Sequence, residues 1–205
     1  MDGDTVGNKA DLRAQYGAPS DRAVRKQLAR LDAHCRDFIA LSPFLVIATS
    51  GADGLADASP RGDAPGFVAV LDDATLLIPD RPGNNRIDSL QNVLDNPGIG
   101  LIFFVPGINE TLRINGHARI TNDADLLAPL AVQGKKPRSG LLVEIKEAYL
   151  HCGKALIRSK LWDPASRIER SRYPSLGKIL VDQIGGADVA ASERSIEEAY
   201  RDRLY

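Results

Sequence analysis

About six short runs of apolar or alternating residues, each bounded by a turn signal, constrain the fold more than any other feature of this sequence. The turn SGADG at 50–54 divides a hairpin pattern over 44–59, and Asp72-Asp73 divides a second one over 67–78. Strands joined by turns this short pair antiparallel, because a parallel connection needs a dozen residues or more. The pattern therefore predicts an antiparallel sheet.

The run 110–120 alternates between polar and apolar residues, with Thr111, Arg113, Asn115 and His117 on one side and Leu112, Ile114 and Gly116 on the other. This alternation indicates a strand with one polar face. An antiparallel sheet of this size hides its edges best by curling into a barrel. No regular alternation of strands and helices points to a Rossmann fold, so we predict a mainly β protein with helices, of the α+β class.

Helical patterns flank these strands. The spacing of Val24, Leu28, Leu31, Cys35 and Phe38 predicts one long helix, which Ser20 or Asp21 caps and Ser42-Pro43 ends. A basic, helical pattern covers 155–172, and two further helices are predicted at 175–184 and 193–204, joined by a turn at 185–187.

The length of 205 residues favours one domain, although two are possible. We expect an N-terminal arm at 1–18 and a barrel domain at 19–165. The remaining residues, 166–205, are expected to form a helical extension that packs on the barrel or on a partner chain.

The charge and composition exclude several classes of protein. A formal net charge of -1 gives no sign of nucleic-acid binding, and no apolar run approaches the length of a membrane span. The N-terminus lacks the apolar core of a secretory signal, so we expect a cytoplasmic protein. Cys35 and Cys152 fit no metal-ligand spacing and are expected to be reduced thiols rather than a disulfide.

The stretch Leu76–Asn96 carries the clearest sign of a ligand. A strand ends at Pro79, a polar loop with Gly83, Asn84 and Asn85 follows, and Arg86 stands near the start of a helix. Free backbone N–H groups and the positive end of a helix both favour an anion, and arginine can hold phosphate with two hydrogen bonds. The same features also suit a simple turn, so both interpretations stand at this point.

Other chemistry is less well supported by the residues. No GxSxG, GxGxxG or GxxxxGK[ST] motif is present, and three scattered histidines do not indicate a metal site. His117 lies on the polar face of a strand, where it could face a ligand. The roles of His151 and Cys152 are open, and the basic loop 134–140 is either solvated or a ligand contact. Cations near strand ends favour an anionic, planar, extended ligand, and these are Arg61, Arg86, Arg113, Lys154, Arg158 and Lys160.

Four segments in order resemble the pyridoxamine 5'-phosphate oxidase-like flavoproteins: SPRGD at 59–63, LLIPDRPGNNR at 76–86, DNPGIGLIFFVPG at 95–107 and ETLRINGHARI at 110–120. The segments 151–162 and 174–186 resemble an uncharacterised subgroup of that family. The resemblance implies an antiparallel Greek-key split β-barrel of the FMN-binding split-barrel type. It also implies a homodimer with FMN at the subunit interface.

Carried over residue by residue, the resemblance assigns Arg61 to the phosphate and pyrimidine edge of FMN and the backbone of Ile78, Pro79 and Asp80 to the flavin ring. It assigns Asn84, Asn85 and Arg86 to the phosphate. Thr111 stands where the family often has a longer glutamine. Three residues, Lys154, Lys160 and Trp162, are expected to reach across from a second subunit.

The resemblance implies an FMN-dependent oxidoreductase that acts on a small-molecule substrate or electron donor, since the flavin supplies the redox chemistry and the protein supplies orientation. The chain lacks the C-terminal Trp-Arg and Arg-x-His elements with which pyridoxamine-phosphate oxidases hold their substrate, so the family name does not define the substrate. Two alternatives remain: a non-catalytic barrel that binds or handles flavin or haem, and a structural barrel with an empty site.

Overall fold

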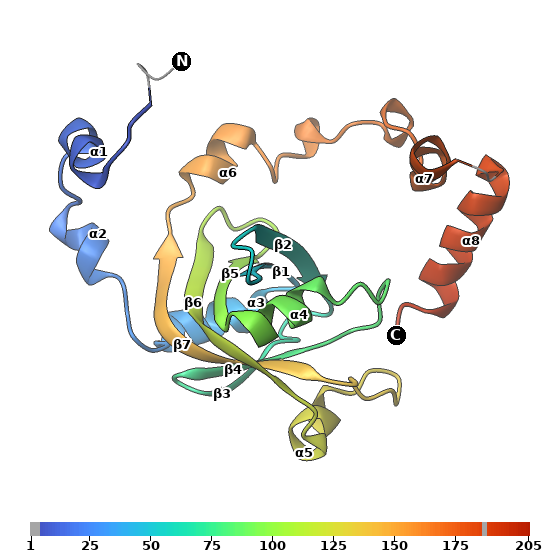
Figure 1. The fold of residues 1–205 in the computed structure, drawn as a ribbon, viewed down its shortest axis with the longest axis horizontal. Helices are drawn as coiled ribbons and strands as arrows, with labels where there is room; N and C mark the ends of the chain where they lie inside the picture. The colour runs from blue at the N-terminus through green and yellow to red at the C-terminus, as the bar shows by residue number, and fades with distance from the viewer. Residues whose placement is uncertain (1–4, 186–187) are drawn as a thin grey trace.

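The computed structural model describes residues 5–185 and 188–205. Seven strands, rather than about six, form one antiparallel sheet in the order β2-β1-β5-β6-β7-β4-β3 (Figure 1). The strands are β1 (Phe44–Ser50), β2 (Ala56–Gly62), β3 (Ala69–Asp72), β4 (Thr75–Pro79), β5 (Gly98–Phe104), β6 (Thr111–Thr121) and β7 (Gly140–His151). The sheet curls but is open between β2 and β3, which lie at the two ends of the strand order. It is therefore a split barrel with helices, as the resemblance implied.

The core lies on the inner face of the curled sheet. Leu45, Ile47 and Phe103 are fully buried there, because every second residue of β1 and β5 points inward. Two helices complete this core: α3 (Ala33–Leu41) packs against β6 and β7, and α4 (Asp88–Asp95) packs against β1, β2 and β6. Each helix contributes apolar side chains to the same buried cluster.

The outer face of β2, β1 and β5 is also apolar, although no other element covers it completely. Register places Pro60, Val46 and Ile102 side by side across the three strands. The next row contains Phe44 and Phe104, whose ring centroids are 6.1 Å apart, and Phe44 is 39% exposed. This face, which we call the outer apolar face, continues onto β6 and β7 with the polar residues Arg113 and Tyr149.

The prediction of one long N-terminal helix from Val24 to Phe38 is wrong. The structure divides it into α2 (Asp21–Arg25) and α3, because Leu28 between them pairs with Ala148 through two backbone hydrogen bonds of 2.8 and 2.9 Å. This contact fills the edge of β7 beyond the end of β4. Asp32 then starts α3 by accepting a hydrogen bond from the N–H of Cys35 at 2.8 Å.

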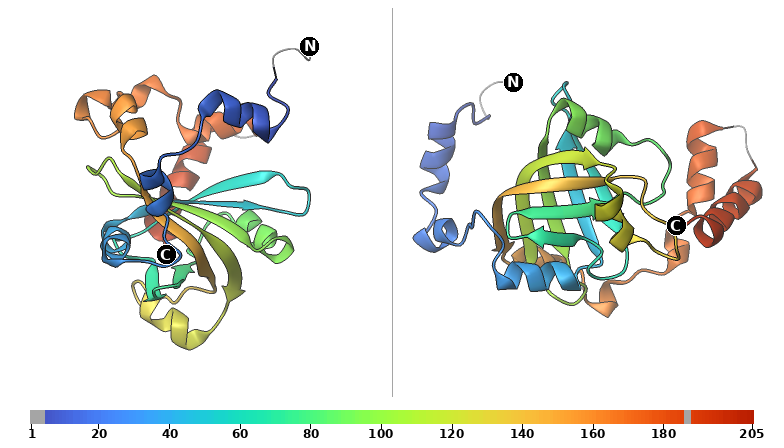
Figure 2. Two further views of the ribbon diagram at one scale, coloured as in Figure 1. Left: turned by 90° about the vertical axis from the view of Figure 1, so that its left-hand side faces the viewer. Right: turned by 90° about the horizontal axis from the view of Figure 1, so that it is seen from below.

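Two arms leave the barrel, as Figure 1 and Figure 2 show. The N-terminal arm contains α1 (Lys9–Tyr16), a helix that the sequence analysis did not predict, and α1 buries no residue. The C-terminal arm contains α6 (Lys154–Ser159), two short 3-10 turns at 164–166 and 170–172, α7 (Leu176–Ile184) and α8 (Val189–Asp202). The helix predicted over 155–172 therefore ends early. The predicted turn at 185–187 lies largely outside the described residues.

Two smaller elements, α5 (Ala124–Leu127) and a 3-10 turn at 128–130, connect β6 to the loop before β7. Among the residues that the structure describes, no helix has the length and apolar character needed to cross a membrane.

Candidate anion-binding site before α4

Strand β2 brings Arg61 to the candidate site. The predicted hairpin pattern ends at 59, but β2 continues through Pro60 and Arg61 to Gly62. Proline is tolerated there because β2 is an edge strand, which does not need every backbone N–H for the sheet. Alternate residues of β2 therefore face α4 rather than solvent, namely Asp57, Ser59 and Arg61.

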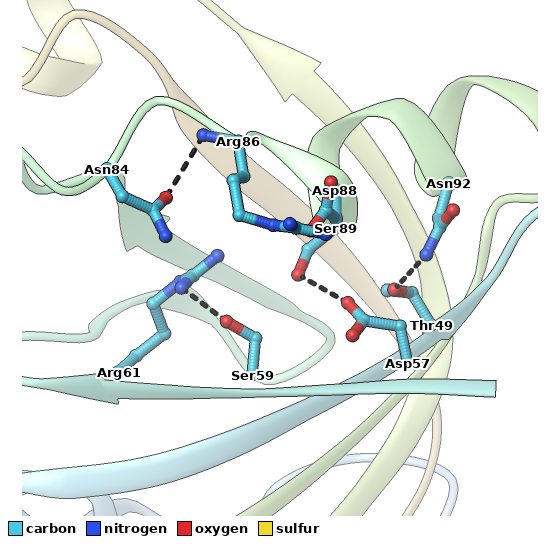
Figure 3. A network of polar contacts seen from close by, with 9 residues as sticks. All are labelled: Thr49, Asp57, Ser59, Arg61, Asn84, Arg86, Asp88, Ser89 and Asn92. Carbon is cyan, nitrogen blue, oxygen red and sulfur yellow. Dashed lines mark hydrogen bonds and ion pairs between the residues drawn. The ribbon is translucent and has the colours of Figure 1, made fainter. Parts of the chain in front are cut away.

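The side chain of Arg61 is held in place but keeps its charge available. Its Nη1 donates to Oγ of Ser59 at 2.7 Å and to the carbonyl oxygen of Pro60 at 3.2 Å. Within the described residues, Arg61 forms no ion pair. Figure 3 shows its guanidinium pointing toward the side chain of Asn84, on the loop that leads into α4. A half-buried arginine without a carboxylate partner is a suitable group for holding an anion.

The loop between β4 and α4 presents its backbone in an unusual conformation. Asn85 and Ile87 have positive φ angles of 58° and 53°, and Arg86 between them does not. Where residues near αL alternate with residues near αR, successive N–H groups turn to the same side of the chain, so two positive φ angles this close together favour an anion-binding concavity. The N–H of Arg86 donates to Oδ1 of Asn84 at 3.0 Å. Those of Asn85, Ile87 and Asp88 have no acceptor among the described residues.

Ile87 is the most strained residue of this loop. A β-branched side chain at positive φ is rare, and such a conformation costs on the order of 1–3 kcal/mol. Ile87 is nevertheless the N-cap residue of α4, and its side chain makes no capping hydrogen bond. The strained residue therefore stands at the start of α4, where no N-cap side chain accepts a hydrogen bond from the first N–H groups of the helix.

Arg86 differs from what the sequence analysis expected of a phosphate ligand. Its side chain is 73% exposed, and its Nε donates to Oδ2 of Asp88 at 2.8 Å. To reach an anion beside Arg61, the guanidinium of Arg86 would have to leave Asp88. The structure therefore gives Arg61 the more direct approach to the loop.

Two side-chain hydrogen bonds fix α4 against the strands (Figure 3). Nδ2 of Asn92 donates to Oγ1 of Thr49 on β1 at 3.1 Å, and Oγ of Ser89 donates to Oδ2 of Asp57 on β2 at 3.4 Å. Sequence reasoning did not identify these four residues, because their partners lie 43 and 32 residues apart. Together these bonds set how far the start of α4 lies from Arg61.

The end of β4 forms another wall of the site. Ile78 and Pro79 have buried side chains, so they can offer a ligand only their backbone. The next residue, Asp80, is half-buried and its N–H donates to the carbonyl oxygen of Ser139 at 3.0 Å. Burial raises the pKa of the Asp80 carboxyl above its usual value, although the charges of Arg61 and Arg138 oppose this effect.

The remaining expected cofactor residues lie elsewhere in the chain. Thr111 is buried at the start of β6, opposite His151. Lys154 at the start of α6 and Lys160 just after its end are exposed, while Nε1 of Trp162 donates to the carbonyl oxygen of Ile108 at 2.9 Å. Within the described chain, none of these four residues bonds to Arg61 or to the loop. One copy of the chain therefore does not bring the whole expected set together.

The histidines and cysteines form no second site. Across residues 5–185 and 188–205, no three His, Cys, Asp or Glu side chains are arranged to hold a metal ion. Both cysteines are free, and burial raises the pKa of the Cys35 thiol to about 11. His117 and His151 are exposed, and the pKa of His151 is lowered by partial burial and by the charges of Arg113 and Lys26.

The fold and this loop define the chain as a split-barrel protein with a candidate anion site at the start of α4. The family model described as Pyridoxamine 5'-phosphate oxidase matches residues 31–152, more than half of the 205 residues. The chain therefore belongs to the pyridoxamine 5'-phosphate oxidase family, which confirms the resemblance found in the sequence.

The likeness to one solved structure, HupZ, supports the same fold. HupZ of Group A Streptococcus is 16% identical with a TM-score of 0.50, and the match covers 58% of this chain and 93% of that one. An FMN-binding protein from Syntrophomonas wolfei is 7% identical, with a TM-score of 0.44 over 70% of this chain and 96% of that one. General stress protein 26 from Bacillus anthracis is 14% identical, with a TM-score of 0.42 and coverage of 57% and 93%. The search of curated proteins found no match.

Proposed function

We propose that the chain binds FMN through the anion-binding site before α4 and acts as an FMN-dependent oxidoreductase on a small-molecule substrate. One observation carries the proposal: Arg61, which forms no ion pair in the described chain, points toward the loop before α4, where the N–H groups of Asn85, Ile87 and Asp88 have no acceptor among the described residues. Membership of the pyridoxamine 5'-phosphate oxidase family supports the choice of a flavin phosphate over other anions.

In this proposal, the residues of the chain bind and orient the cofactor. Arg61 holds the phosphate through its guanidinium, and the N–H groups of Asn85, Ile87 and Asp88 complete the cradle. Asn84 contributes its side-chain amide, and Arg86 contributes charge once it leaves Asp88. The backbone of Ile78–Asp80 lies along the ring, and bound FMN would supply the redox chemistry of the reaction.

We further propose that the working form is a homodimer whose copies meet through the outer apolar face. That face has Val46, Pro60 and Ile102 at its centre and continues into a depression of about 380 Å³ lined by residues such as Ala48, Gly100 and Asn115. Apolar faces of this kind mark interaction surfaces. A second copy also gives Lys154, Lys160 and Trp162 a way to reach a site that they do not reach within one chain.

The proposal is tested by the visible spectrum of the purified protein and by titration with FMN. We expect absorbance bands of bound flavin, or quenching of FMN fluorescence on addition to colourless protein, and a rise in melting temperature with FMN concentration. A protein that neither quenches FMN nor gains thermal stability from it would contradict flavin binding.

Reduction of the bound flavin separates an enzyme from a carrier. Anaerobic addition of NADH, NADPH or a candidate substrate should bleach the flavin bands if the chain is an oxidoreductase. Tight flavin binding without reduction by any donor would instead favour a role in binding or handling the cofactor.

A further inference from the structure

The phenol of Tyr205, at the far end of the C-terminal arm, reaches back to the barrel. Its hydroxyl donates to Oδ1 of Asp63 at 2.7 Å, and the centroid of its ring lies 5.9 Å from Cζ of Arg81. Its backbone oxygen accepts a hydrogen bond from Nζ of Lys135 at 2.7 Å. Residues 200–204 just before it are exposed, whereas Tyr205 is half-buried. The contact therefore anchors the end of the arm.

The groups that receive Tyr205 form a buried ion pair. Nε of Arg81 donates to Oδ2 of Asp63 at 2.6 Å, and the two side chains are 15% and 3% exposed. Nη1 of Arg81 also donates to the carbonyl oxygen of Leu130 at 2.9 Å. Oδ1 of Asp63 accepts from Ala64 N–H as well as from Tyr205. Each oxygen of this buried carboxylate is therefore engaged, which is what a buried charge requires.

This ion pair joins the two halves of the candidate anion site. Asp63 stands two residues after Arg61, and Arg81 stands three residues before Asn84. The pair thus links the end of β2 to the start of the loop that the anion would contact. Any loosening of Asp63 or Arg81 changes the separation between Arg61 and the loop.

We propose that Tyr205 is a positioning residue for the anion site: its contact with Asp63 and Arg81, which we call the C-terminal latch, couples docking of the C-terminal arm to binding of the flavin phosphate. Coupling of this kind is reciprocal, so the ligand should also hold the arm in place. The ligand half of this inference rests on the proposed function, while the docking of the arm does not.

The test compares Tyr205→Phe, which keeps the ring and loses only the hydroxyl, with the wild type. Tyr200→Phe is the matched control, because Tyr200 is exposed on α8. We expect Tyr205→Phe to weaken FMN binding by roughly tenfold, within the range of allosteric couplings, and the control to leave it unchanged. Equal FMN affinity in wild type and Tyr205→Phe would overturn the coupling.

Hydrogen exchange gives a readout that does not need flavin. In the protein without FMN, Tyr205→Phe should speed exchange in α8 and in the loop 80–87, whereas Tyr200→Phe should not. In the wild type, saturating FMN should slow exchange in α8, and this effect should be lost in Tyr205→Phe. If the wild type binds no FMN, the proposed function fails, yet unchanged exchange in loop 80–87 would still overturn the latch and faster exchange would support it.

Discussion

Arg81 and Asp63 form an ion pair of 2.6 Å that connects the first turn after β4 to the end of β2. Both side chains are largely buried, so neither charge is well solvated if the other is removed. The pair therefore couples stability to the geometry of the anion site, and it can be tested by substitution on either side.

Asp63→Asn should destabilise the protein. It leaves the guanidinium of Arg81 without its counter-charge, and breaking a buried pair in this way costs on the order of 3–5 kcal/mol. Chemical denaturation at neutral pH measures the change. Asp182→Asn is the control, because it removes an exposed partner of Lys178 on α7 and should leave stability nearly unchanged. A loss no larger than that of the control would contradict the role given to Asp63.

The same carboxylate predicts how stability responds to acid. Burial acts to raise the pKa of Asp63, but hydrogen bonds from Tyr205 and Ala64 and the charge of Arg81 outweigh it, so the pKa lies below its usual value of 3.8. Below that value the unfolded chain binds the proton more readily than the folded one, so stability falls as pH falls. The melting temperature should therefore decrease as the pH is lowered below about 4, and this decrease should be less steep in Asp63→Asn than in the wild type.

Ile87 offers a test of the strain in the loop. Asparagine tolerates positive φ better than isoleucine does, and the Ile87 side chain is 51% exposed, so little burial is lost on substitution. Ile87→Asn should stabilise the protein without FMN by about 1 kcal/mol in denaturant unfolding. Leu94→Asn, at an exposed α4 position, is expected to destabilise slightly through lost helix propensity. Destabilisation by Ile87→Asn would show that the strain estimate is wrong.

The two arginines of the site should differ in their effect on FMN. Arg61→Ala removes the half-buried guanidinium that points to the loop, and we expect a loss of affinity of about 2 kcal/mol or more by fluorescence titration. Arg86→Ala removes an exposed side chain that is paired with Asp88, so its loss should be clearly smaller. Arg119→Ala, at an exposed position on β6, controls for net charge. The reverse order of effects would move the phosphate from Arg61 to Arg86.

Local signals in the sequence predicted the strands and the loop because turns, alternation and breakers act over a few residues. The break at Leu28 was not predictable in this way. The spacing of the apolar residues around Leu28 suits a helix. The backbone of Leu28 instead pairs with Ala148 at the open edge of β7, and this tertiary contact overrides the local helical preference. The contact of Tyr205 with Asp63 spans 142 residues and follows no periodicity. Local patterns therefore pointed to the candidate site, whereas the contacts between its elements emerged only from the tertiary structure.

The last prediction concerns dimerisation through the outer apolar face. Val46→Glu places a charge at the centre of the face between Pro60 and Ile102, where a second copy would have to desolvate it at a cost of several kcal/mol. Light scattering after gel filtration should show a dimer for the wild type and a monomer for this variant. FMN affinity should fall when dimerisation is lost, because the residues expected from the partner are then missing.

Leu71→Glu provides the matched control for this experiment. Leu71 is an exposed apolar residue on β3, at the opposite end of the strand order, so its substitution should leave the dimer and FMN binding intact. Val46 points away from the core, so Val46→Glu should fold normally. A thermal melt of the variant checks this. A folded Val46→Glu protein that remains a dimer would place the interface elsewhere. A monomeric wild type that binds FMN would show that one chain completes the site alone.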